Sequence, residues 1–214
     1  MPASDELRFF NPRAEIGFTA NRLPHWQQEG AVYFATFRLG DSVPGPLLTQ
    51  WRGERERWLK HHPPPWADAV EREYHARFTT AMERWLDAGH GTCVLRQPDC
   101  AEVVAGALRH FESVRCRQIA WVIMPNHVHA LFTVQEGHTL EALLHSWKLF
   151  SARRINARLG QTGSLWQRDY FDRLVRDAAH FARCVRYIRK NPGQAKLRDG
   201  EFMRWESERA KQIE

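Results

Sequence analysis

The sequence has no uninterrupted apolar run of the about 18 residues that a membrane-spanning helix needs. Its first residues, MPASDELRFFNPRAE, lack both the basic start and the apolar segment of a secretory signal peptide. Only four of the 214 residues are cysteines, and none of them stands in a CxxC or zinc-finger spacing. These absences predict a cytoplasmic protein with free thiols and without a membrane partner.

The composition is that of a globular protein, with 43% hydrophobic residues and nine tryptophans, and the length predicts one domain over residues 1–214.

Positive charge is concentrated in one part of the chain. Residues 145–198 hold 13 Lys and Arg against three Asp, a local charge of +10, whereas the rest of the chain carries −4. Such a concentration favours a polyanion docked on one surface. A solvated face of arginines that binds nothing is the alternative.

Hydrophobic periodicity predicts the order of the elements. Residues 31–39 have the composition of a strand, and residues 43–89 contain two helical patterns that predict an inserted helical hairpin. The second of these helices carries an apolar stripe of Val70, Tyr74, Phe78, Ala81 and Trp85. Core packing is the ordinary role of such a stripe.

Beyond the insertion the chain alternates again. The predicted elements are a helix at 99–112, strands at 116–124 and 127–134, helices at 138–160 and 178–190, and a strand at 165–176. Asn191-Pro192 is expected to end the last helix, and residues 199–214 are expected to form a charged tail or a short terminal helix. This order predicts an α+β fold with a ferredoxin-like antiparallel sheet, helices on one face and a free second face for a ligand.

Two histidines interrupt the apolar stretch WVIMPNHVHALFTV. His127 and His129 are two residues apart in a predicted strand, so both side chains project from the same face. Two adjacent imidazoles suit a metal ion or a proton-transfer site better than an apolar core. On its own, an HxH pattern is a weak signal.

The segment YIRKNP offers a second set of polar groups. Tyr187 and Asn191 are four residues apart, so they lie on one face of the predicted helix. Two imidazoles and one amide oxygen could form a divalent-metal site with open positions, and the adjacent tyrosine could act as a nucleophile. A terminal Asn that caps its helix and a Tyr in the core are the plainer alternatives.

MPNHVH, SWK, LWQRDYFDRLVR and YIRKNP together resemble the REP-associated tyrosine transposases. These are single-tyrosine members of the HUH endonuclease group, the insertion sequence 200-like transposases. The resemblance extends from about Ala31 to Leu197 and omits the insertion. It implies that His127 and His129 bind Mg²⁺ or Mn²⁺ and that Asn191 is the third ligand, at a position where simpler relatives have Gln.

The resemblance further implies that Tyr187 attacks the scissile phosphate of single-stranded or hairpin DNA, expels a 3′-hydroxyl and forms a 5′-phosphotyrosine. Because the unperturbed pKa of tyrosine is about 10, the phenol needs activation, which the bound metal and the basic residues around it are expected to provide. A monomer and a homodimer are both compatible with the sequence.

Basic and aromatic side chains near these motifs are the predicted DNA-binding residues. They are Lys148, Arg153, Arg154, Arg158, Arg168, Arg183, Arg186, Arg189, Lys190 and Trp166. For Trp166, burial in the core is the alternative. Two other functions stay open: a DNA-hairpin-binding protein that has lost catalysis, and a small-molecule metal hydrolase built on the HxH pair. The intact His and Tyr set disfavours the first of these, and the local charge of +10 disfavours the second.

Overall fold

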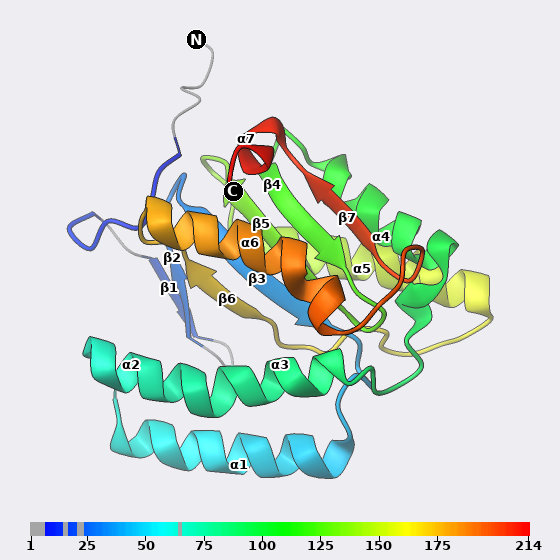
Figure 1. Cartoon of the computed structure of the whole chain (residues 1–214), viewed down its shortest axis with the longest axis horizontal. Coiled ribbons are helices and arrows are strands. Elements are labelled where there is room, and N and C mark those ends of the chain that lie inside the picture. The colour runs from blue at the N-terminus through cyan, green and yellow to red at the C-terminus, as the bar shows by residue number, and fades with distance from the viewer. Residues whose placement is uncertain (1–6, 15–16, 21–23, 64–65) are drawn as a thin grey trace.

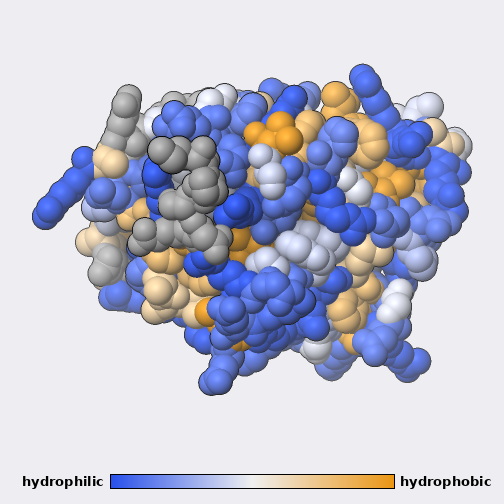
Figure 2. Space-filling view, turned by 90° about the horizontal axis from the view of Figure 1, so that it is seen from above, coloured by the Kyte–Doolittle hydropathy of each residue, from blue (hydrophilic) through white to orange (hydrophobic). Residues whose placement is uncertain are grey.

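The structure, a computed structural model, describes residues 7–14, 17–20, 24–63 and 66–214. The first six residues of the predicted domain and residues 64–65 of the predicted hairpin lie outside this range. In the described part, no helix is both long and apolar enough to cross a membrane. The face of the molecule in Figure 2 is mainly hydrophilic, with small separate hydrophobic patches.

The centre of the fold is a five-stranded antiparallel sheet with the order β6-β3-β5-β4-β7. Its strands are β3 (Val32–Arg38), β4 (Cys116–Ile123), β5 (His127–Val134), β6 (Phe171–Leu174) and β7 (Met203–Glu206). Without β7, this is the strand order of a ferredoxin-like fold. The predicted α+β class and ferredoxin-like sheet are therefore confirmed.

Helices cover both faces of the sheet, so the expectation of helices on one face only is wrong. Helices α4 (Pro98–His110) and α5 (Leu140–Leu159) pack on one face. Helices α6 (Ala178–Gln194) and α7 (Glu208–Lys211) pack on the other, where α6 crosses the sheet in Figure 1. The physical reason is that every residue of β3 and β5 is buried, which requires cover on both sides.

The insertion forms the helical hairpin that lies along one edge of the molecule in Figure 1. Helix α1 (Gly45–His61) is followed by a continuous helical stretch of α2 (Asp68–Tyr74), the π-helical segment η1 (His75–Thr79) and α3 (Thr80–Asp87). The hairpin has an apolar core of its own. Its stripe differs from the expected one: beyond Phe78 the buried residues are Met82 and Leu86, because the π-helical turn adds a residue and shifts the register.

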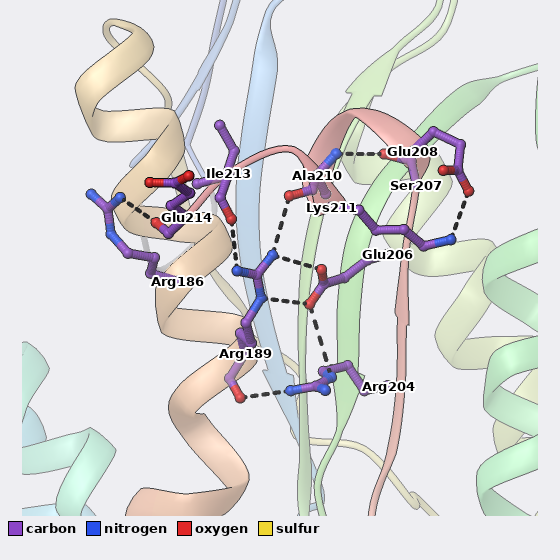
Figure 3. Close-up of polar contacts among 10 residues, drawn as sticks. All are labelled: Arg186, Arg189, Arg204, Glu206, Ser207, Glu208, Ala210, Lys211, Ile213 and Glu214. Atoms are coloured by element: carbon purple, nitrogen blue, oxygen red, sulfur yellow. Dashed lines mark hydrogen bonds and ion pairs between the residues drawn. The ribbon is translucent and has the colours of Figure 1, made fainter.

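The C-terminal segment forms strand β7 and the short helix α7, where a charged tail or a short terminal helix was expected. Strand β7 pairs with β4, and the indole of Trp205 stacks on that of Trp121 with ring centroids 6.1 Å apart. The carboxylate of Glu206 accepts two hydrogen bonds from Arg189 of α6 (Figure 3). Alternating apolar and charged residues suit an edge strand, and this pattern was hidden by the high local charge.

Three smaller elements complete the fold. Strands β1 (Gly17–Ala20) and β2 (Pro24–Gln27) form a separate two-stranded hairpin. The 3₁₀-helix η2 (Val94–Arg96) leads from the insertion into α4.

Candidate active site

A tight turn places the histidine pair at the start of β5. The chain reverses at Pro125-Asn126, where the backbone N–H of Met124 donates to the His127 carbonyl at 2.8 Å. Backbone groups from two other segments hold the turn: Leu39 N donates to the Asn126 carbonyl and Leu95 N to the Pro125 carbonyl. The end of β3 and the exit of the insertion therefore fix where β5 begins.

The two imidazoles converge. His127 and His129 are each 1% exposed, project from the sheet face that α6 covers, and bring their Nε2 atoms within 3.0 Å of each other. Nitrogens that are each ~2.1 Å from a common metal lie ~3 Å apart when the angle between the bonds is about 90°. The spacing of the pair therefore fits two ligands of one divalent cation.

Hydrogen bonds at the opposite ring nitrogens orient both imidazoles. The Nδ1–H of His127 donates to the Oδ1 of Asn126 at 2.8 Å, and the Nδ2 of Asn126 donates to the carbonyls of Leu86 and His90. This network assigns Oδ1 as the acceptor and leaves a lone pair on the Nε2 of His127. The Nδ1 of His129 lies 2.7 Å from the Oγ1 of Thr36, its partner on β3. Such partners keep the Nε2 of a metal-binding histidine available.

Burial keeps both rings neutral. It lowers the pKa of His127 to about 3, with a smaller opposing effect of Asn191 and a further lowering by Arg38. The pKa of His129 lies well below its ordinary value. Burial is the largest cause, followed by the charge interactions with His127 and Arg173. Neutral imidazole is the form that binds a metal.

Tyr187 lies beside this pair. Its hydroxyl oxygen is 3.5 Å from the Nε2 of His129. The ring of Phe34 packs on both residues, stacked on His129 and edge-on to Tyr187, with centroid distances of 5.6 and 5.7 Å. Because Tyr187 comes from α6 and the histidines from β5, the packing of this helix on the sheet is what brings the phenol and the imidazoles together.

The expectation that the basic residues of α6 lower the pKa of Tyr187 is wrong. The pKa of Tyr187 is raised well above its ordinary value, mainly by burial and then by the negative charges of Glu83 and Asp87 of α3. The positive charge of Arg173 of β6 opposes them. The basic side chains of α6 lie on other sides of the helix than the phenol. Arg186 and Arg189 bond to the C-terminal segment, whereas the hydroxyl of Tyr187 points toward the sheet. The insertion therefore contributes two carboxylates to the surroundings of the phenol.

Asn191 is part of the helix and does not end it, contrary to expectation, since α6 continues through Pro192 to Gln194. The residue is fully buried, and in the described part of the chain neither the oxygen nor the nitrogen of its side-chain amide has a hydrogen-bond partner within the usual distance and angle. The amide is close enough to His127 to raise its pKa. A buried, unsatisfied amide next to two converging imidazoles fits a third ligand of a divalent cation.

Carboxylates and thiols do not complete such a site. Among the described residues, no group of three or more His, Cys, Asp and Glu side chains could hold a metal ion. The Asn191 amide is therefore the candidate for a third protein ligand, and a phosphate oxygen of the substrate could occupy an open position.

The predicted DNA-binding residues fall on both faces of the sheet. Arg153, Arg154 and Arg158 are exposed on α5, on the face opposite the histidines, where Arg158 forms an ion pair with Asp99 of α4. Arg183 and Lys190 are exposed on α6, on the histidine side. The charge of +10 is thus divided between two surfaces, and the expectation of one basic surface is wrong because the sheet separates the two helices.

Three more of the predicted DNA-binding side chains contact the protein itself. Arg189 bonds to Glu206 and to the carbonyls of Ala210 and Ile213, and Arg186 bonds to the Glu214 carbonyl (Figure 3). On the far side of the sheet, the Nζ of Lys148 donates to the carbonyl of Arg168 at 2.6 Å. These contacts tie the C-terminal segment to α6 and the loop before β6 to α5.

Trp166 is a core residue. It is 4% exposed, its indole N–H donates to the Oγ of Ser151 at 2.9 Å, and its ring packs edge-on against Phe37. Stacking on an unpaired base requires an open ring face, which this packing does not leave. The predicted contact between Trp166 and DNA is therefore not supported by the structure.

Sequence reasoning missed four residues around the site: Thr36, Glu83, Asp87 and Arg173. Thr36 could have been found, because it is the one aliphatic hydroxyl in the apolar strand that pairs with the histidines. The two acids could not, since no local pattern links α3 to a helix a hundred residues later.

The structure combines a ferredoxin-like sheet, a histidine pair on an inner strand and a tyrosine on a helix that covers the same face. Residues 94–191 match the family described as "Transposase IS200 like", a segment that includes His127, His129, Tyr187 and Asn191. This match confirms the predicted resemblance to that family.

Two solved structures are similar to the chain. A REP-associated tyrosine transposase bound to a REP hairpin is 17% identical, with a TM-score of 0.41, over 78% of this chain and 69% of that one. A candidate transposase from Deinococcus radiodurans R1 is 15% identical, with a TM-score of 0.31, over 75% of this chain and 89% of that one. At these values neither likeness supports a statement about function. No curated protein matches the chain.

Proposed function

We propose that the protein cleaves and rejoins single-stranded or hairpin DNA through a covalent 5′-phosphotyrosine bond at Tyr187, with Mg²⁺ or Mn²⁺ held by His127, His129 and Asn191. The observation that carries this proposal is the 3.5 Å approach of the Tyr187 hydroxyl to the Nε2 of His129, beside the converging Nε2 of His127. A nucleophile within reach of metal-ligand positions is the arrangement that phosphodiester transfer needs.

The chain's own residues account for most of the steps. Tyr187 loses its O–H proton to water, its phenolic oxygen forms a bond to phosphorus, and the 3′-oxygen leaves with the electron pair of the broken bond and takes up a proton. A divalent cation held by His127, His129 and Asn191 would supply positive charge that stabilises the developing negative charge of the phosphate. Phe34 packs on both His129 and Tyr187 and limits the access of water to the phenol.

Rejoining is the reverse of cleavage. Because the phosphotyrosine bond is itself a phosphodiester, a different DNA 3′-hydroxyl can displace the tyrosine without a nucleoside triphosphate. The family match supports a transposase-type role in DNA processing. Hairpin DNA is the form that the resemblance of the sequence motifs implies, and it is the form to test first.

A labelled-hairpin assay tests this proposal. The protein is incubated with end-labelled hairpin oligonucleotides and Mn²⁺ or Mg²⁺, and a denaturing gel is examined for a covalent protein–DNA adduct. We expect an adduct that Tyr187→Phe abolishes while hairpin binding persists. Tyr33→Phe is the matched control, because the Tyr33 hydroxyl bonds to Gln28 and packs in the opposite core.

The same assay decides among the alternative functions. Hairpin binding without an adduct, in either metal, would instead support the DNA-binding protein that has lost catalysis. Absence of both binding and adduct would favour the small-molecule hydrolase.

A further inference from the structure

One buried arginine lies next to the histidine pair. Arg38 is the last residue of β3, and in the register of the two strands it is directly opposite His127 of β5. Side chains of directly opposite residues project from the same sheet face, with Cβ atoms about 4.5–5.5 Å apart. Thr36 and His129, the next pair on this face, show the arrangement, since their polar atoms lie 2.7 Å apart. The Arg38 side chain therefore leaves the sheet beside a candidate metal ligand.

The guanidinium of Arg38 has few partners for a buried charge. The residue is 4% exposed, and among the described residues its one hydrogen-bond partner is Ser42, whose Oγ accepts an N–H of Nη1 at 3.2 Å. No carboxylate in the same part of the chain forms an ion pair with it. Because a guanidinium has five N–H donors, most of those of Arg38 can still bind an acceptor.

The charge of Arg38 is retained despite its burial. Burial and the nearby charge of Arg52 lower the pKa of Arg38 to about 10, and the charge of Asp169 raises it. The side chain is therefore a cation at neutral pH. Since an isolated buried charge is costly, buried charges in proteins are ordinarily paired. A buried cation with several available donors is suited to an anion that binds during function.

The position of Arg38 favours a phosphate as this anion. The planar fork of a guanidinium can donate two parallel hydrogen bonds to two oxygens of one phosphate group. His127 and His129 are each 1% exposed, so a phosphate that reaches them enters an enclosed space. Arg38 borders the same space, because it is the neighbour of His127 on that face of the sheet.

We propose that Arg38 is a further substrate-binding residue, whose guanidinium donates hydrogen bonds to the non-bridging oxygens of the scissile phosphate and stabilises the negative charge that develops there. This inference rests on the proposed function. Arg38 lies outside the segment of the family match, which begins at residue 94. Ser42 is a positioning residue in this account: its Oγ holds the guanidinium, and its own O–H donates to the Leu39 carbonyl at 2.8 Å.

Arg38→Met separates this role from a structural one. The variant keeps most of the length of the side chain and removes the buried charge, while Ser42 keeps its bond to Leu39. If the charge serves to bind an anion, its removal should leave the thermal midpoint of the ligand-free protein unchanged or raise it. If Arg38 supports the fold, the midpoint should fall. Arg57→Met is the matched control, because Arg57 is an exposed arginine of α1 that bonds to the Gly53 carbonyl.

Inorganic phosphate provides a readout that needs neither metal nor DNA. The thermal midpoint is measured with EDTA in phosphate and in chloride buffers of equal ionic strength. We expect phosphate to raise the midpoint of the unmodified protein and of Arg57→Met by more than that of Arg38→Met. Because the general stabilising effect of phosphate on folded proteins is common to all three, the difference reports binding at Arg38.

Adduct formation then tests the reaction itself. With Mn²⁺ and a labelled hairpin, we expect the single-turnover rate of adduct formation to fall about 10–100-fold in Arg38→Met, the usual effect of losing hydrogen bonds to a charged group. Arg38→Lys, which keeps the charge but not the fork, is expected to recover part of the rate. Arg57→Met is expected to react at the normal rate.

Three results would overturn this inference and leave the proposed function standing. They are normal adduct formation by Arg38→Met, a lower thermal midpoint of that variant in chloride, and a response of that variant to phosphate equal to that of the unmodified protein. If the unmodified protein forms no adduct, the proposed function fails, and with it the assignment of Arg38 to the scissile phosphate. A phosphate response that depends on Arg38 would in that case still support an anion site beside His127.

Discussion

His127 and His129 point their Nε2 atoms at each other across 3.0 Å inside the protein. An N–H···N hydrogen bond between the two rings satisfies this distance, and so do two lone pairs that share one cation, as the proposed function requires. Four predictions about this site and the segments around it, and one about DNA binding, can be tested.

The first prediction concerns metal binding. Mn²⁺ at about 100 times its Kd should stabilise the protein by about 2.7 kcal/mol, because it binds only the folded state. A thermal unfolding series with and without Mn²⁺ measures this effect. His129→Ala should abolish the shift, whereas His138→Ala, an exposed histidine, should retain it. A shift that survives His129→Ala would place the metal elsewhere.

The second prediction concerns the orientation of His129. Thr36→Val removes the hydroxyl next to the Nδ1 of His129 and keeps the shape of the side chain. We expect Mn²⁺ affinity, measured by calorimetry, to fall about 10–100-fold, the usual effect of losing such a partner. Thr133→Val is the control on the same face of β5, at its far end. Equal affinities of the two variants would contradict the assigned role of Thr36.

The third prediction concerns the return of the insertion to the fold. Gly91 has a φ of +86°, and a Cβ there would lie 2.6 Å from the Asp41 carbonyl oxygen. Gly91→Ala should therefore lower the free energy of unfolding by about 1–3 kcal/mol, as measured in urea. Gly89→Ala, with a φ of +69° but no atom within 4 Å, should have a smaller effect. The reverse order would contradict this account.

The fourth prediction concerns pH. Burial and the charge of Glu83 raise the pKa of Asp87 to about 6. An acid with a raised pKa in the folded state lowers stability as pH rises from its unfolded value, about 4, through about 6. Asp87→Asn should therefore be more stable than the unmodified protein at pH 7.5, and the difference should vanish near pH 4. Thermal unfolding at both values measures it.

A control separates this effect from the loss of one negative charge. Asp199→Asn changes the net charge equally at an exposed position. If it stabilises the protein as much as Asp87→Asn does, the cause is net charge and not the burial of Asp87.

The fifth prediction concerns DNA and rests on the proposed function. Lys190 is exposed on the face that carries Tyr187, whereas Arg153 is exposed on the opposite face. Lys190→Ala should reduce the slope of log K against log salt for a hairpin by about 0.7–0.9, as expected for one lost phosphate contact. Arg153→Ala should leave the slope unchanged. Fluorescence anisotropy in a salt series measures both, and a larger effect of Arg153→Ala would move the DNA to the other face.

Local sequence patterns were sufficient for much of the fold. The alternation of strands and helices, the insertion and the shared face of His127 and His129 all follow from periodicities of two or about 3.6 residues. The same local reasoning failed at Pro192 and at β7. Packing of α6 on the sheet retained a helical turn that proline disfavours, and pairing with β4 ordered a segment that charge alone marked as a tail.

The sequence by itself determined the chemistry that is available: two imidazoles side by side on one strand, and a tyrosine and an amide one turn apart on a helix. Only the tertiary structure decided which groups meet them. Arg186 and Arg189, next to Tyr187 in the chain, bond to the C-terminal segment, whereas the charge of Glu83, a hundred residues earlier, raises the pKa of the phenol. The reason is that side-chain direction along one element is local, but contacts between elements depend on how the helices pack on the two faces of the sheet.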